Sequence, residues 1–138
     1  MTKSEILEFI NANPLCFMAT TEGDTPHVRG MRAYKADYDG IIFYTSKDKA
    51  VHQQLTQNPK AEICFYDFQN IIQVRTSGKM EPIEDLELKK EIGSTRPNAK
   101  ARVGKEGYDW MAVYKLKNVK VSIWSQKMIN TPKTLIDL

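Results

Sequence analysis

Residues that usually mark a reactive centre are scarce in this sequence. Among 138 residues there are two cysteines and two histidines, and none of them shows the CxxC or Cys/His spacing of a metal site. Cys16 and Cys64 lie far apart, which favours reduced, buried thiols in a cytoplasmic protein over a disulfide. No GxSxG motif and no Ser/His/Asp set stands out. These absences argue against zinc enzymes and serine hydrolases.

Long apolar runs and blocks of like charge are missing as well. No stretch approaches the roughly 20 apolar residues of a membrane span, and residues 1–14 have the pattern of an amphipathic helix rather than a signal peptide. The net charge of +3 is small and dispersed, so nucleic acid is not the expected partner, although a small anionic ligand is compatible with it. The 41% hydrophobic content is ordinary for a globular protein. We expect one cytoplasmic domain over residues 1–138 that contacts neither membrane nor nucleic acid.

The apolar periodicity predicts a mainly β protein. A helix before Pro14 is followed by strands over residues 15–21, 27–36 and 41–45, and Asp39-Gly40 is a hairpin signal. Further along, the pattern predicts a helix over 46–58, strands over 61–68 and 70–83, a helix over 84–93, a polar loop over 94–110 that could cover a ligand, and strand–turn–strand over 110–124. Short connections between consecutive strands favour an antiparallel split barrel of six to seven strands with two to four helices.

The start of the predicted helix 46–58 carries two lysines where the helix dipole disfavours cations. Lys47 and Lys49 would lie in the first turn, beside unpaired backbone N–H groups and the hydroxyls of Thr45 and Ser46. Donors and cations that converge on a helix N-terminus form an anion site, and phosphate is the commonest such anion. In the alternative interpretation Ser46 is a simple N-cap, Asp48 satisfies the dipole and both lysines are solvated.

The strand before the hairpin contributes a second set of candidates. We expect residues 27–34 to pair with residues 41–47 across the Asp39-Gly40 turn, which would bring Arg29 and Arg32 toward the lysines. The odd spacing of the two arginines places them on opposite faces of a regular strand, so at most one can reach the anion unless a bulge at Gly30 intervenes. Gly30 either lets a ligand approach the backbone or marks a bulge or packing gap.

The order of these motifs resembles a known family. "RGMRAY", "FYTSKDKAVHQQLTQNPKAEICFY" and "IIQVRTSGKMEPI" are similar to the FMN-binding split-barrel proteins related to pyridoxamine 5′-phosphate oxidase, and "VKVSIW" resembles the family's late strand. The likeness runs from Leu15 to Trp124. Where true oxidases carry an Arg-Lys pair this chain has Asp48-Lys49, and Tyr34 replaces a lysine that helps to hold the substrate phosphate. The tail also lacks their substrate-binding arginine and histidine, so the general stress or nitroimidazole-reductase-like branch is the better match.

The resemblance implies a homodimer with FMN at each subunit interface. Its candidate phosphate ligands are Arg29, Ser46, Lys47 and Lys49, and the backbone of Arg29, Gly30 and Met31 would lie along the ribityl chain and ring together with Tyr44 and Thr45. Gln73 and Trp124 would complete the pocket, partly from the partner subunit. Taken alone, Gln73 also fits a solvent-facing strand residue, and Trp124 a core or dimer-contact residue.

The implied function is that of a flavoprotein oxidoreductase. Electrons would pass from a nicotinamide cofactor through FMN to a small acceptor such as a quinone, a nitro compound or oxygen. No acid–base residue stands out, since His27 and His52 are isolated, and flavin chemistry needs little from the protein beyond orientation. The alternatives are a non-catalytic flavin store or sensor, a relative that binds deazaflavin or haem, and a small nucleic-acid-binding barrel.

Overall fold

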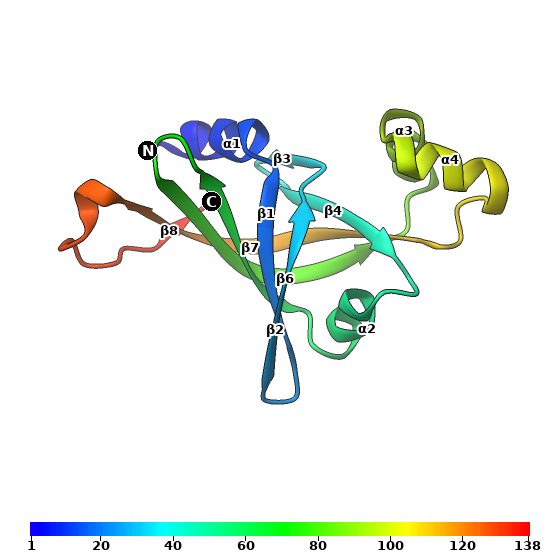
Figure 1. Ribbon diagram of the computed structural model, residues 1–138, viewed down its shortest axis with the longest axis horizontal. Helices are drawn as coiled ribbons and strands as arrows, with labels where there is room; N and C mark the ends of the chain where they lie inside the picture. The colour runs from blue at the N-terminus through cyan, green and yellow to red at the C-terminus, as the bar shows by residue number, and fades with distance from the viewer.

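One antiparallel sheet of eight strands organises the molecule (Figure 1). The computed structural model describes residues 1–138. The strand order is β2-β1-β5-β6-β7-β4-β3, and β8 pairs with β7. The strands are β1 (Leu15–Glu22), β2 (Thr25–Arg32), β3 (Lys35–Asp37), β4 (Gly40–Ser46), β5 (Lys60–Asp67), β6 (Ile72–Ile83), β7 (Met111–Ser125) and β8 (Ile136–Asp137). The predicted mainly β, antiparallel split-barrel class is confirmed.

Four α-helices flank the sheet. They are α1 (Lys3–Ala12), α2 (Ala50–Gln57), α3 (Leu86–Thr95) and α4 (Pro97–Glu106), and a short 3₁₀ turn spans Gln126–Met128. Thr2 and Glu5 form a reciprocal capping box that starts α1, as the amphipathic pattern predicts. Figure 1 shows α3 and α4 at one end of the sheet, far from α1 and from β8. No helix has the length and apolar character that crossing a bilayer requires.

The core lies on the inner face of the sheet, where α1 and α2 pack. Phe43 and Phe65 are both fully buried, and their ring centroids are 6.5 Å apart. Ile6 of α1 and Leu55 of α2 belong to the same buried cluster. On the opposite face, Ile92 of α3 and Ala99 of α4 form a second buried cluster with Ile42 of β4 and with Met111 and Val113 of β7.

The sheet does not close into a complete barrel. β2 pairs only with β1, as far as Arg32 opposite Leu15, and the chain then crosses so that β3 pairs with the first three residues of β4. The rest of β4 pairs only with β7. The free edge of β2 and the free edge of β4 beyond Ile42 therefore face an open seam, where backbone N–H and C=O groups have no strand partner.

The predicted helix 46–58 is wrong at its start. Ser46 still belongs to β4, paired with Met111, and α2 begins at Ala50 with Lys49 as its N-cap residue. Strand pairing overrides the local helix signal at Ser46. Lys47 and Lys49 therefore precede the helix instead of occupying its first turn.

Three other predictions are wrong. The two that concern strands fail because a local sequence pattern does not show which distant segments pair. Where strand–turn–strand was predicted over 110–124, the structure has one long strand, β7 (Met111–Ser125), whose irregularity at Asn118 (φ 54°) is a bulge opposite a register shift at Ser77/Lys79, not a turn. Residues 27–34 do not form a hairpin with residues 41–47: β2 pairs with β1, and β4 pairs with β3 and β7, although the N–H of Tyr34 donates to the carbonyl oxygen of Ile42. The polar stretch 94–107 contains the whole of α4.

The close approach of β6 and β7 at this bulge depends on a glycine. A Cβ on Gly78 would lie 2.4 Å from the carbonyl oxygen of Lys117, whereas one on Gly30 would meet no atom within 4 Å. We expect Gly78→Ala to lower the free energy of unfolding by about 1–3 kcal/mol, because the backbone must shift to relieve the overlap. Gly30→Ala is the control and should change it by less than about 0.5 kcal/mol. If urea denaturation gave the same loss of unfolding free energy for both variants, this packing would be contradicted.

Candidate functional site

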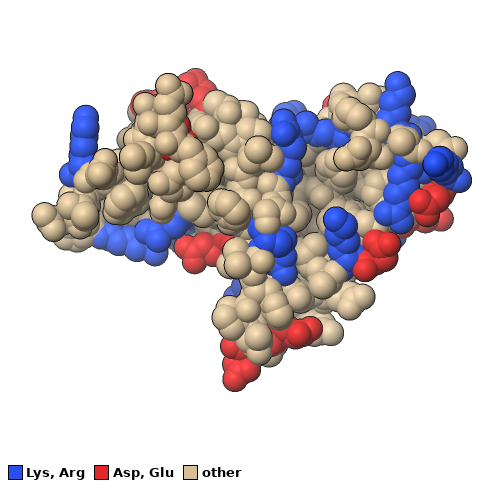
Figure 2. All heavy atoms as spheres, viewed as in Figure 1, with Lys and Arg blue, Asp and Glu red and all other residues tan.

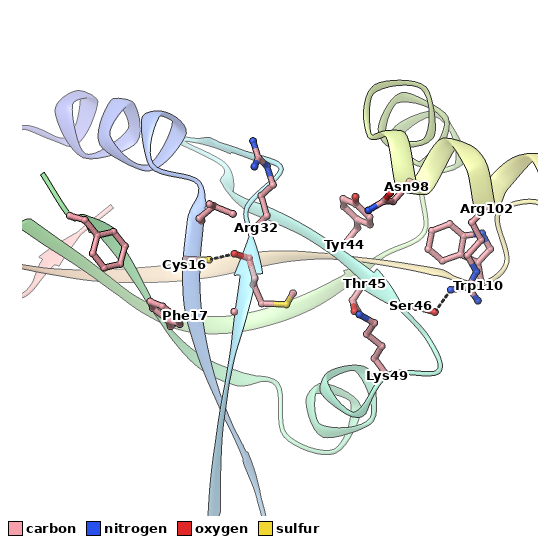
Figure 3. Close-up of a pocket in the computed structure, with 15 residues that line it drawn as sticks. Cys16, Phe17, Arg32, Tyr44, Thr45, Ser46, Lys49, Asn98, Arg102 and Trp110 are labelled. Carbon is pink, nitrogen blue, oxygen red and sulfur yellow. Dashed lines mark hydrogen bonds between the residues drawn. The ribbon is translucent and has the colours of Figure 1, made fainter.

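A cavity lies at the open seam of the sheet. Its volume is about 650 Å³, within the range of small-molecule sites. β2 and β4 form two of its walls, and α4 closes it from the other side (Figure 3). The lining residues are Leu15, Cys16, Phe17, Gly30, Met31, Arg32, Tyr44, Thr45, Ser46, Lys49, Phe68, Asn98, Ala99, Arg102 and Trp110.

The two unpaired strand edges supply the polar part of the cavity wall. Gly30 and Met31 come from the edge of β2, and Tyr44 and Thr45 from that of β4. Because a Cβ on Gly30 would meet nothing within 4 Å, the cavity reaches the backbone there. A flat ligand with alternating donors and acceptors on its rim can therefore pair with main-chain groups on either side.

Lys49 provides a positive charge at the α2 end. It lines the cavity and forms no ion pair within the chain. As the N-cap residue of α2 it gives the helix no side-chain acceptor, so the first backbone N–H groups of α2 have no side-chain cap. An uncapped helix N-terminus beside an unpaired ammonium group is suited to an anion.

Arg102 ties α4 to the loop between β4 and α2. Its Nη1 donates to Ser46 Oγ at 2.7 Å, and its Nη2 lies 3.9 Å from Asp48 Oδ2. Its Nε donates to Glu106 at 2.7 Å, and the guanidinium carbon lies 4.3 Å from the centroid of the Trp110 ring. The Ser46 hydroxyl donates in turn to Asp48 and, with the nearby Arg102 charge, holds the pKa of that carboxyl below its usual value. These contacts fix α4 as a wall of the cavity.

The chemistry that the lining itself can perform is limited. It contains no histidine, aspartate or glutamate. Burial raises the pKa of the Cys16 thiol to about 12, so this group stays protonated and is a poor nucleophile. The cavity is therefore equipped to bind and orient a ligand more than to exchange protons with it.

Six of the ten predicted site residues line this cavity: Gly30, Met31, Tyr44, Thr45, Ser46 and Lys49. Lys47 does not line it. The side chain of Arg29 lies on the other face of β2, where it donates to the carbonyl of Met18, to Thr20 Oγ1 and to Gln54 Oε1. Arg32, not Arg29, lines the cavity. The roles of all ten in cofactor binding remain predictions.

Gln73 and Trp124 are not among the residues that line the cavity of their own chain. They are direct cross-strand partners on β6 and β7. Cross-strand partners point to the same face of a sheet, so the two side chains lie together. Val74, the residue after Gln73 on β6, is fully buried on the inner face. Gln73 and Trp124 therefore lie on the outer face.

Sequence reasoning missed the contribution of α4. Asn98, Ala99 and Arg102 line the cavity from a segment that was predicted as a loop. The segment is polar, which hid its helical period. The signals that could have revealed it are Pro97 at the first helical position and Gly107 at the end, where φ is 76°.

Basic side chains surround the mouth of the cavity. Figure 2 shows lysine and arginine side chains around the hollow between the sheet and the α3–α4 end of the molecule. Arg32, Lys49 and Arg102 are the cationic lining residues, and Asp48 and Glu106 lie beside Arg102. The surroundings of the cavity favour an anionic ligand.

Solved structures share the fold of this chain. A NimC/NimA family protein from Clostridium acetobutylicum is 24% identical, with a TM-score of 0.79 over 98% of this chain and 92% of that one. General stress protein 26 from Bacillus anthracis is 16% identical, with a TM-score of 0.74 over the full length of both. A pyridoxamine 5′-phosphate oxidase-related, FMN-binding protein from Nostoc punctiforme is 15% identical, with a TM-score of 0.68 over 99% and 96% of the two chains.

Sequence relatives point to the same group. A protein from Mesorhizobium japonicum named pyridoxine/pyridoxamine 5′-phosphate oxidase is 32% identical over 75% of this chain and 48% of its own length. One of the same name from Maricaulis maris is 31% identical over 60% and 37%. The chain thus spans less than half the length of these curated relatives. The pyridoxamine 5′-phosphate oxidase family model matches residues 2–125. By that match over most of its length, the chain belongs to the pyridoxamine 5′-phosphate oxidase family.

Proposed function

We propose that the seam cavity binds FMN and that the protein is an FMN-dependent oxidoreductase. It would take electrons from a nicotinamide cofactor and pass them to a small acceptor. The observation that carries the proposal is the combination, in one cavity, of two unpaired strand edges with an unpaired lysine at an uncapped helix start. The flat ring of FMN has a polar rim that would pair with the strand edges, and its phosphate would bind the lysine and the helix start.

The phosphate end is assigned to Lys49 and the start of α2. Lys49 forms no ion pair within the chain, and Thr45 contributes a hydroxyl group from the adjoining end of β4, whereas the Ser46 hydroxyl is already bound to Asp48 and Arg102. Asp48 would repel a phosphate, but its carboxylate is held by Ser46 and by the Arg102 charge. The donor set therefore fits a phosphate monoester through charge and hydrogen bonding together.

The ring end is assigned to the seam itself. The edges of β2 and β4 offer main-chain donors and acceptors, while Met31, Tyr44 and Trp110 supply apolar surface. Bound flavin supplies the chemistry, because its ring accepts electrons from one substrate and releases them to another. The residues of this chain hold the ring, and α4 shields it from water.

The proposal includes a homodimer in which the partner completes the site. The outer face of the sheet carries a row of cross-strand partners, Phe17, Cys64, Arg75 and Ser122. Phe17 is 49% exposed and also lines the cavity mouth, and Arg75 Nε is buried without a hydrogen-bond partner. An apolar residue exposed beside an unsatisfied arginine is expected where a second chain packs.

The pair Gln73 and Trp124 lies two residues along β6 and β7 from Arg75 and Ser122, on the same face. In a dimer built on this face, both side chains can reach the cavity of the other subunit. This would account for their absence from the lining of the cavity in their own chain.

We do not expect oxidation of pyridoxamine phosphate itself. Tyr34 occupies the place of the lysine that helps to hold the substrate phosphate in the true oxidases. Its hydroxyl donates to Glu91 Oε2 at 2.8 Å, and a carboxylate there would repel a phosphate. A flavin store or sensor without turnover is the second candidate, because the lining has no acid–base residue.

The visible absorption spectrum and FMN affinity of the purified protein test the cofactor assignment. We expect bound or readily bound FMN, and weaker binding of riboflavin, which lacks the phosphate. Lys49→Gln should weaken FMN about tenfold and leave riboflavin unchanged, since one charge-assisted contact of about 1.4 kcal/mol is lost. Lys35→Gln removes an exposed lysine of β3, outside the cavity, and serves as the control.

Each outcome bears on a different part of the assignment. A protein that neither carries nor takes up FMN contradicts it altogether, and a bound deazaflavin or haem changes the function. An equal loss of affinity for FMN and for riboflavin in Lys49→Gln would mean that the phosphate binds elsewhere. Bound FMN that is never reoxidised by a panel of quinones, nitro compounds and oxygen after reduction by a nicotinamide cofactor favours the store or sensor.

Light scattering tests the dimer. We expect a particle of twice the chain mass, and Phe17→Lys should shift it toward the monomer because it places a charge in the apolar interface. Leu135→Lys changes a residue of similar exposure in the C-terminal tail and should leave the dimer intact. A monomeric wild-type protein, or equal effects of the two variants, would refute this interface. FMN affinity should fall together with the dimer, since Gln73 and Trp124 of the partner are then lost.

A further inference from the structure

Arg32 is a cavity residue to which FMN binding assigns no role. It lies at the end of β2, opposite Leu15, and it is exposed. Its guanidinium makes no hydrogen bond or ion pair within the chain. Among the three cations of the lining, Arg102 is paired with Asp48 and Glu106, which leaves Lys49 and Arg32 unpaired.

The two unpaired cations lie at different ends of the cavity. Figure 3 shows Arg32 on the side of α1, whereas Lys49 lies beside α2 and Arg102 beside Trp110. Arg32 is the last residue of β2, after which the chain crosses from the side of β1 to that of β4. Lys49 lies beyond the opposite end of β4. One phosphate group cannot neutralise both. If Lys49 holds the FMN phosphate, Arg32 faces a different ligand.

The residues around Arg32 indicate the shape and charge of that ligand. Leu15 is the direct partner of Arg32 and Phe17 that of Gly30, and these apolar side chains are 63% and 49% exposed. Gly30 and Arg32 are two residues apart on the same face of β2, roughly 7 Å. The space at Gly30 is open. A flat ring can therefore rest between Gly30 and these apolar side chains and direct an acidic substituent toward the guanidinium.

We infer that Arg32 is a specificity-determining residue that selects a planar aromatic acceptor bearing an anionic group, either carboxylate or phosphate. This inference rests on the proposed function, because it assumes that FMN occupies the Lys49 end. A guanidinium binds carboxylate or phosphate through two parallel hydrogen bonds, which a lysine in the same place cannot reproduce. The preference therefore depends on geometry as well as on charge.

Binding to the oxidised, FMN-loaded protein tests the inference. The probes are 4-nitrobenzoate and 4-nitrobenzamide, which share a ring and a nitro group and differ in charge. Affinity is measured from the change in the flavin absorption spectrum and by calorimetry. We expect the wild type to bind the carboxylate at least tenfold more tightly than the amide. Arg32→Gln should abolish this preference without changing the affinity for the amide, and Arg32→Lys should restore only part of it.

Lys100→Gln is the matched control. It removes the same charge from an exposed position of α4 that does not line the cavity, and it should leave both affinities unchanged. Phenyl phosphate compared with phenol, under the same conditions, distinguishes a phosphate-selective site from a carboxylate-selective one.

The outcomes separate the two proposals. FMN that is retained while the wild type binds both nitro compounds equally, or binds neither, overturns the role of Arg32 and leaves the flavin assignment standing. A loss of affinity in Arg32→Gln that is equal for the acid and the amide, or equal to that in Lys100→Gln, also overturns it. A wild-type protein unable to bind FMN refutes the proposed function, and the present inference with it.

Discussion

The failure of the sheet to close is the constraint on which the rest of the structure depends. β2 leaves β1 at Arg32, and the chain reaches β4 only through the short strand β3, so two strand edges face each other without pairing. Unpaired backbone groups next to an apolar core need water, a ligand or another chain. The cavity lies at these edges, and the helix α4, the start of α2 and the outer face of β1 all meet there. The site is thus a consequence of the topology.

Charge then divides the cavity into regions with different tasks. At one end Arg102 is committed to Ser46, Asp48 and Glu106, which fixes α4 and leaves Lys49 as the cation for a ligand. At the other end Arg32 stands unpaired beside apolar residues of β1. The absence of acid–base residues from the lining is consistent with a protein that leaves electron transfer to a cofactor and controls which molecules approach it.

Local sequence patterns correctly predicted the features that depend only on residues close together in the sequence. The capped, amphipathic α1, the Asp39-Gly40 turn and the alternation that separates Arg29 from Arg32 all follow from neighbouring residues. Partners distant in sequence decided the rest. Ser46 stays in β4 because Met111 pairs with it, β7 continues through Asn118 because a bulge absorbs the irregularity, and α4 is held by contacts of Arg102 with a loop more than 50 residues earlier. For the same reason Arg29 was expected in the cavity where Arg32 lies. The motif order identified the family because spacing between motifs preserves topology, which single motifs do not.

Amide hydrogen exchange with and without FMN tests the central claim most directly, namely that the open seam is the flavin site. The account predicts that FMN slows exchange at the amides of residues 30–32 of β2 and 44–46 of β4 that point into the seam, and at the first turn of α2, because these amides have no partner until the ligand provides one. The polar groove formed by Asn58, Lys60, Ser77 and Lys79 should be unaffected. Protection confined to that groove, or FMN binding without protection of either seam edge, would contradict the account.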